Sequence, residues 1–145
     1  MTPEKFLSAA DEQEVVQAIR MAEQATSGEI RVHIERTVPG GDAVARAKEL
    51  FVELGMSATA LRNGVLIYVA AEDHKFAICG DKGIDEVVED DFWDCTKDAM
   101  QDEFRHGRFK QGLIDGISRA GSRLRQYFPG RHDDTNELPN EISNG

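Results

Sequence analysis

An almost uninterrupted apolar run, Val65 to Ala70, is the feature that most constrains how this chain folds. The run follows the turn pair Asn63-Gly64 and consists mainly of strand-forming residues, as in a central strand covered on both faces. The short segment Glu72 to His74 connects it to a second strand-like run, Lys75 to Gly80. Because parallel strands need a much longer crossover, this spacing predicts an antiparallel hairpin.

The segments around this hairpin are mainly helical in pattern. Apolar residues recur at helical spacing in four stretches, at about residues 8–26, 42–55, 90–104 and 109–128. Between the first two stretches, Ile30, Val32 and Ile34 alternate with polar residues, which predicts a strand near a sheet edge with one face toward water. The expected fold class is α/β, with helices flanking a small mixed sheet.

Length and charge limit the classes of partner. With 145 residues the chain suits one domain, which we expect over residues 1–128, followed by a polar, mobile tail over 129–145. The 27 acidic and 17 basic residues give a net charge of -10, which repels nucleic-acid backbones and anionic membranes. Neither an apolar stretch of roughly 20 residues nor a signal-peptide pattern is evident, so we expect a cytoplasmic protein.

The predicted topology brings three separate segments to one edge of the sheet. If the strand around Ile30 to Ile34 runs parallel to Val65–Ala70 and Lys75–Gly80 runs antiparallel, the starts of the first two lie beside the end of the third. The segments 27–29, 62–64 and 80–83 are then expected to meet.

Acidic residues are concentrated directly after that edge. Ten of the 27 acidic side chains lie between Asp81 and Glu103, where only Lys82 and Lys97 offset them, so this window carries -8 of the total -10. Carboxylate and carbonyl oxygens beside a glycine-bearing loop are what a hard divalent cation requires. We therefore expect a site for Ca²⁺, with Mg²⁺ or Mn²⁺ as alternatives. Its candidate ligands are Glu29, Asn63, Asp81, Asp90, Asp91 and Asp94.

Each candidate also has a purely structural interpretation. Asp81 suits a turn aspartate that caps its own backbone, and Asn63-Gly64 is an ordinary turn pair. Asp98 and Asp102 point away from the apolar stripe of their helix, which favours a solvated acidic face. Glu103 falls within that stripe and is expected to pair with an arginine. No zinc-ligand spacing, nucleophile elbow or phosphate loop supports covalent or zinc-dependent catalysis.

A family resemblance rests on four motifs in order and at their spacing. They are Thr26-Ser27-Gly28-Glu29-Ile30, Asn63-Gly64-Val65-Leu66-Ile67, Gly80-Asp81-Lys82-Gly83-Ile84, and Phe104-Arg105-His106-Gly107-Arg108-Phe109 with Gly112-Leu113. Through them, residues 6 to 128 resemble the TPM-domain family, which includes thylakoid-lumen proteins linked to photosystem II repair. The resemblance implies a Rossmann-like, three-layer α/β/α sandwich. It also implies divalent-cation binding, often of calcium, at an acidic edge, and an acid phosphatase activity reported for some members.

The family pattern marks the same corner, namely Glu29, Asn63, Asp81 and the acids at the start of the third helix, nearest Asp90. This chain departs from the pattern where many relatives have an aspartate immediately before Asn-Gly, because Arg62 stands there. A cation thus replaces one acidic contributor, so an altered or weaker metal site is expected. Many relatives also carry export signals or membrane anchors, which are not evident in this sequence.

We therefore expect a small cation-binding α/β domain that acts as a regulatory or interaction module with a protein partner. The first alternative is a metal-dependent acid phosphatase acting on phosphomonoesters, in which the cation polarises phosphate and activates water. A net charge of -10 argues against it, since such a protein repels a phosphate ester. The second alternative is a protein-interaction domain that uses no metal.

Overall fold

The structure is a computed structural model that describes residues 7–59, 61–89, 91–130 and 142–144. Its sheet has four strands in the order β3-β2-β1-β4, with β1 at Glu29–Glu35, β2 at Gly64–Ala70, β3 at Lys75–Gly80 and β4 at Ser143–Asn144. β1 pairs in parallel with both β2 and β4, whereas β2 and β3 are antiparallel. The predicted mixed sheet and its hairpin are confirmed.

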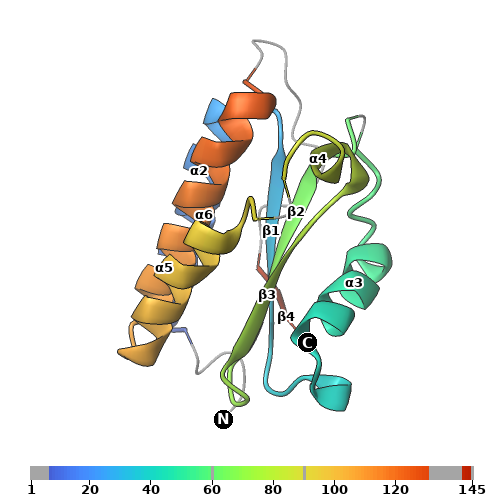
Figure 1. The fold of residues 1–145 in the computed structure, drawn as a ribbon. Helices are drawn as coiled ribbons and strands as arrows, with labels where there is room; N and C mark the ends of the chain where they lie inside the picture. The colour runs from blue at the N-terminus through green and yellow to red at the C-terminus, as the bar shows by residue number, and fades with distance from the viewer. Residues whose placement is uncertain (1–6, 60, 90, 131–141, 145) are drawn as a thin grey trace.

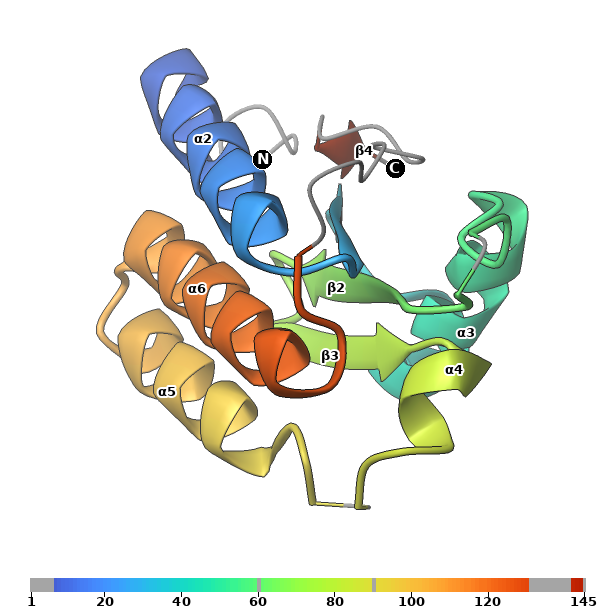
Figure 2. The same cartoon turned by 90° about the horizontal axis from the view of Figure 1, so that it is seen from above.

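Helices cover both faces of this sheet (Figure 1). One layer contains α2 (Ala9–Ala25), α5 (Asp94–Arg105) and α6 (Phe109–Tyr127), and α3 (Ala43–Glu53) covers the opposite face. The view from above shows the two helical layers on either side of the strands (Figure 2). The expected three-layer α/β/α sandwich is therefore confirmed.

Alternation along the strands creates two apolar cores. Ile30, Val65 and their alternate neighbours face the three-helix layer, whereas Leu66 and Tyr68 face α3. In the three-helix layer, α6 lies between α2 and α5 and approaches them closely at glycines. A Cβ atom at Gly116 would lie 2.4 Å from the Met100 sulfur, so a larger residue there would force the Met100 side chain to shift.

The predicted helices are present, with one shifted start. Ser8 and Asp42 cap α2 and α3 by accepting hydrogen bonds from backbone N–H groups three residues later, at 3.1 Å in each case. The third helix, α5, begins only at Asp94. The preceding residues form turns that bury two consecutive aromatic side chains, Phe92 and Trp93. None of the helices that the structure describes has the length and apolar composition of a membrane span.

Three short elements were not predicted. They are a 3₁₀ turn, η1 (Pro39–Gly41), a one-turn helix, α4 (Lys82–Asp85), and β4 in the C-terminal segment. Ile142 packs against the main core and Ser143 pairs with His33 of β1, so these tail residues are held against the domain. The rest of the tail that we expected to be mobile, residues 131–141 and 145, lies outside the described residues.

The polar face of β1 differs from our expectation. We predicted that it faces water near a sheet edge, but β4 continues the sheet beyond β1. The side chains of Glu29, His33 and Glu35 are buried, with residue exposures of 4%, 4% and 7%. A period-2 pattern separates two faces, but it does not determine whether the polar face meets solvent or a polar interior.

Candidate functional site

The three segments predicted to meet do so at one end of the sheet. Glu29 is in register with Gly64, and its backbone N–H donates to the Asn63 carbonyl oxygen at 3.3 Å. On the other side of β2, the Asp81 N–H donates to the Gly64 carbonyl oxygen at 2.9 Å. Glu29, Gly64 and Asp81 thus form one row across three strands. Because alternate residues point to opposite faces, this row lies on the side of the sheet that α3 covers.

Asp81 is the most constrained of the predicted ligands. Its carboxylate accepts two hydrogen bonds from the Arg62 guanidinium, at 3.0 Å and 3.1 Å, and a third from the Lys82 backbone N–H at 2.7 Å. Asp81 is 4% exposed, whereas the Arg62 side chain is 48% exposed. The hydrogen bonds and charge of Asp81 raise the pKa of Arg62. Asp81 therefore caps α4, as its structural interpretation predicted. At the same time it binds the positively charged guanidinium of Arg62.

Gly83 fixes the backbone on which this pair depends. Its N–H donates to the Arg62 carbonyl oxygen at 2.8 Å, and a Cβ atom at Gly83 would lie 2.2 Å from the Leu61 oxygen and 2.5 Å from the Arg62 oxygen. Only glycine allows so close an approach of the two loops. Arg62 itself adopts a left-handed backbone with φ of 51°, which this contact helps to hold.

Glu29 and Asn63 complete the interior of the corner. Asn63 is 1% exposed, and its N–H donates to the Thr59 hydroxyl at 3.3 Å. Its side-chain amide donates to the Ser27 hydroxyl at 3.5 Å. A carboxylate at Glu29, an amide at Asn63 and a carboxylate at Asp81 are thus buried on adjacent strands. Oxygen donors of this kind suit a hard cation.

Glu23, which the sequence analysis did not select, also reaches this corner. One of its carboxyl oxygens, Oε2, accepts a hydrogen bond from the Ile30 N–H at 2.8 Å, and the other, Oε1, is buried without a hydrogen-bond partner among the described residues. Burial raises the pKa of Glu23 to about 8. The hydrogen bond from the Ile30 N–H opposes this shift, and the negative charge of Glu29 adds a smaller contribution to it. The only feature of the sequence that pointed to Glu23 was its position as an acidic residue near the end of a predicted helix.

Among the described acids of the next segment, Asp91 and Asp94 do not join the buried carboxylates of the corner. Asp91 is exposed in the turns before α5, and the Asp94 side chain is 61% exposed and lies 3.8 Å from the Lys97 ammonium. Asp90 lies outside the described residues. Over the ranges that the structure describes, no three His, Cys, Asp or Glu side chains lie close enough together to hold a metal ion. α5 begins at Asp94, and Asp91 precedes it by three residues, so the helix starts later in the chain than predicted. The roles of Asp91 and Asp94 as metal ligands stay predictions.

A second buried polar cluster lies toward the other end of β1. Glu35 accepts two hydrogen bonds from Arg46, at 2.5 Å and 3.1 Å, and one from the Tyr68 hydroxyl at 2.7 Å. His33 Nδ1 lies 2.9 Å from the Ser143 hydroxyl, and His33 Nε2 lies 3.4 Å from Glu35. Burial lowers the pKa of His33. For Glu35, burial alone would raise the pKa, but the hydrogen bonds that its carboxylate accepts outweigh this effect and hold its pKa below the usual range. No local sequence pattern indicates this cluster, because its members come from β1, β2, α3 and the tail.

The comparisons with known proteins identify the family. The sequence pattern of the TPM domain matches residues 1–123, so the chain belongs to the TPM-domain family. It is similar to the BA42 protein of the psychrophilic bacterium Bizionia argentinensis, whose NMR structure shares 57% sequence identity at a TM-score of 0.92 and is aligned over 98% of this chain and 97% of that one. None of the curated proteins matches the chain.

Two more distant structures share the fold. The N-terminal domain of the cg2496 protein from Corynebacterium glutamicum is 14% identical at a TM-score of 0.65, over 96% of this chain and 80% of that one. The N-terminal domain of a protein from P. gingivalis is 18% identical at a TM-score of 0.70, over 88% and 82% of the two chains. At these identities the likeness concerns the fold alone.

Proposed function

We propose that this protein binds a divalent cation, Ca²⁺ with Mg²⁺ or Mn²⁺ as alternatives, and acts as a regulatory or interaction module. The observation that supports the proposal is the row of buried oxygen donors at the sheet end. Glu29 and Asp81 are each 4% exposed, and Asn63, which directly precedes the Gly64 that lies between them, is 1% exposed. Burying a carboxylate is costly unless positive charge or hydrogen bonds compensate it, so buried carboxylates favour a bound cation.

Arg62 supplies one such cation from within the chain. Its guanidinium binds both oxygens of Asp81, yet the side chain is half exposed and is not packed in the core. A divalent ion at Glu29, Asn63 and Asp81 would therefore compete with Arg62 for the same carboxylate. Asp90, Asp91 and Asp94, on the following segment, would add negative charge that attracts the ion without all being direct ligands.

The experiment is thermal unfolding of chelator-treated protein against increasing Ca²⁺, Mg²⁺ or Mn²⁺, compared with the Asp81→Asn and Asp98→Asn variants. An ion that binds only the folded state stabilises it by about 2.7 kcal/mol at 100 times its dissociation constant. We expect a saturable rise in Tm for the unmodified protein and for Asp98→Asn, whose altered residue is exposed on α5. Asp81→Asn should lose most of the rise. Equal responses in all three proteins would place the ion elsewhere.

One observation favours a second candidate, the interaction domain without a metal. Arg62 already neutralises Asp81, so the corner is electrostatically complete at that carboxylate without an ion. If the protein is an interaction domain that uses no metal, we expect that no divalent ion raises its Tm. The phosphatase alternative is tested in the same preparations, because ion-dependent hydrolysis of p-nitrophenyl phosphate that Asp81→Asn abolishes would assign an enzyme.

A further inference from the structure

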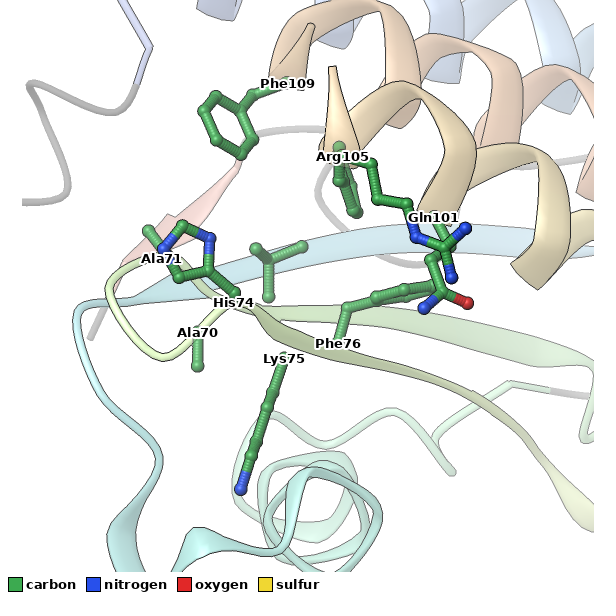
Figure 3. A pocket seen from close by; sticks show the side chains of 10 residues that line it. Ala70, Ala71, His74, Lys75, Phe76, Gln101, Arg105 and Phe109 are labelled. Atoms are coloured by element: carbon green, nitrogen blue, oxygen red, sulfur yellow. The ribbon is translucent and has the colours of Figure 1, made fainter. Parts of the chain in front are cut away.

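We propose that a cavity at the opposite end of the sheet from Asp81 binds a small aromatic carboxylate. The cavity has a volume of about 160 Å³ and lies where the β2–β3 hairpin meets the corner between α5 and α6. Most of its lining surface is apolar and comes from Val69, Ala71, Phe76, Phe104 and Phe109. Figure 3 labels Ala71, Phe76 and Phe109 among them. This site is separate from the proposed cation site, and neither proposal depends on the other.

The volume selects the size of the ligand. An apolar cavity of about 150 Å³ in another protein holds one benzene molecule. A cavity of 160 Å³ therefore admits a single six-membered ring and excludes larger fused ring systems. Aromatic side chains favour such a ring, because edge-to-face and offset contacts add to the gain from burial.

The aromatic wall is built by the fourth sequence motif, which the cation site does not use. The Phe104 ring meets Phe76 edge-on at 5.2 Å between centroids and lies 5.9 Å from Phe109. A Cβ atom at Gly112 would lie 2.5 Å from the Phe104 ring, so a glycine at this position lets the ring pack against α6. The motif thus gives the cavity a fixed shape.

An ion pair stabilises the turn between α5 and α6, which carries this aromatic wall. Arg108 donates to the Glu103 carboxylate at 2.6 Å, and its N–H donates to the Glu103 carbonyl oxygen at 3.0 Å. The arginine partner expected for Glu103 is therefore confirmed as Arg108. This pairing leaves Arg105, the other arginine of the motif, available for a different role.

The positive charge of Arg105 at the rim selects an anion. Arg105 and His74 line the cavity, and neither makes an ion pair within the described part of the chain. Lys75 points away from it, since its ammonium donates to the Gly41 carbonyl oxygen at 2.7 Å (Figure 3). Although the protein has 27 acidic residues, none of the Asp and Glu residues that the structure describes lines this cavity; Asp94 and Asp98 lie in the neighbouring hollow beside Lys97. A carboxylate on the ring would meet Arg105 as a charge-assisted hydrogen-bond acceptor.

The test is an NMR titration of the full-length protein with phenylacetate and, in parallel, with the uncharged benzyl alcohol. We expect phenylacetate to shift the amide signals of Ala71, Phe76 and Phe109 saturably and to bind more tightly than benzyl alcohol. Arg105→Gln should weaken phenylacetate binding by about tenfold and leave benzyl alcohol unchanged. The matched control, Arg119→Gln, alters an exposed arginine on α6 and should change neither.

A second variant tests occupancy of the cavity itself. Ala71→Leu places three additional carbon atoms in the space that the ring would fill, so it should abolish binding of both compounds. If this variant does not fold, the ratio of phenylacetate to benzyl alcohol affinity in Arg105→Gln still tests the proposal. The proposal is overturned if phenylacetate does not shift the cavity signals, or if benzyl alcohol binds as tightly as phenylacetate.

Discussion

The guanidinium of Arg62 and the carboxylate of Asp81 meet through two hydrogen bonds of 3.0 Å and 3.1 Å at the end of the sheet. The pair is unequal, because Arg62 is half exposed whereas Asp81 is buried. Removing the arginine leaves a buried carboxylate without its counter-charge, whereas removing the carboxylate releases an arginine into solvent. This asymmetry makes Arg62 a sensitive probe of whether an ion competes for the corner.

Arg62→Gln is expected to lower Tm in the presence of chelator but to increase the affinity for Ca²⁺. The loss of stability follows from the uncompensated charge of Asp81, and the gain in affinity follows because the ion no longer displaces a guanidinium. Calorimetric titration with Ca²⁺ and thermal unfolding measure the two effects. Arg119→Gln, on the exposed face of α6, serves as control. Weaker Ca²⁺ binding in Arg62→Gln would contradict competition at Asp81.

Gly83→Ala is expected to destabilise the fold by about 1–3 kcal/mol, because the added methyl group overlaps the carbonyl oxygens of Leu61 and Arg62. Urea unfolding measures the change in the free energy of unfolding. Gly80→Ala is the matched control, since its Cβ atom would meet the Ile84 side chain at an ordinary 3.5 Å. Equal losses in the two variants would show that the contact between the loops is not responsible.

Glu23 is expected to make the protein less stable as the pH rises. The pKa of its carboxyl is about 8 in the folded protein and near 4.5 in the unfolded chain, so the unfolded chain releases this proton first. Its contribution to stability is present at low pH and is lost between about pH 4.5 and 8. Glu23→Gln keeps an acceptor for the Ile30 N–H and removes the ionisation. It should be more stable than the unmodified protein by about 2 kcal/mol at pH 8.5.

Urea unfolding at pH 5.5 and pH 8.5, in the presence of chelator, measures this difference. Glu53→Gln, which alters an exposed carboxylate in α3, should change stability little at either pH. If the difference between Glu23→Gln and the unmodified protein is the same at both pH values, Glu23 is not protonated in the folded protein.

His33 is expected to make the protein sensitive to acid. Burial keeps the pKa of the folded residue below 6.5, so as the pH falls the unfolded chain takes up this proton first. The associated stability is complete above about pH 6.5 and is lost as the pH falls toward the lower folded-state pKa. NMR titration of the His33 ring measures that pKa directly. A chain that ends at residue 141 lacks β4 and should show a higher pKa for His33. If the pKa of His33 were the same in the shortened chain, β4 would not be what buries this residue.

Much of the architecture followed from the sequence alone, because local patterns report which residues must be buried. The apolar run of β2, the short connection to β3 and the helical spacing of α2 and α6 each predicted an element and its neighbours. Parallel and antiparallel pairing then placed Glu29, Asn63 and Asp81 at one end of the sheet before any contact was known. A β-branched or apolar residue indicates by its own chemistry that it will be buried, because its burial is favourable whichever segment of the chain covers it.

The tertiary structure decided what those polar residues contact. Arg62 and Asp81 are 19 positions apart, and whether a carboxylate binds a guanidinium or an ion depends on distances of a few ångströms that no local pattern encodes. In the same way, β4 converts the polar face of β1 into an interior, and Gly112 shapes a cavity through its contact with Phe104. Burial of apolar groups is non-directional and follows from sequence, whereas hydrogen bonds and ion pairs are directional and require the folded geometry.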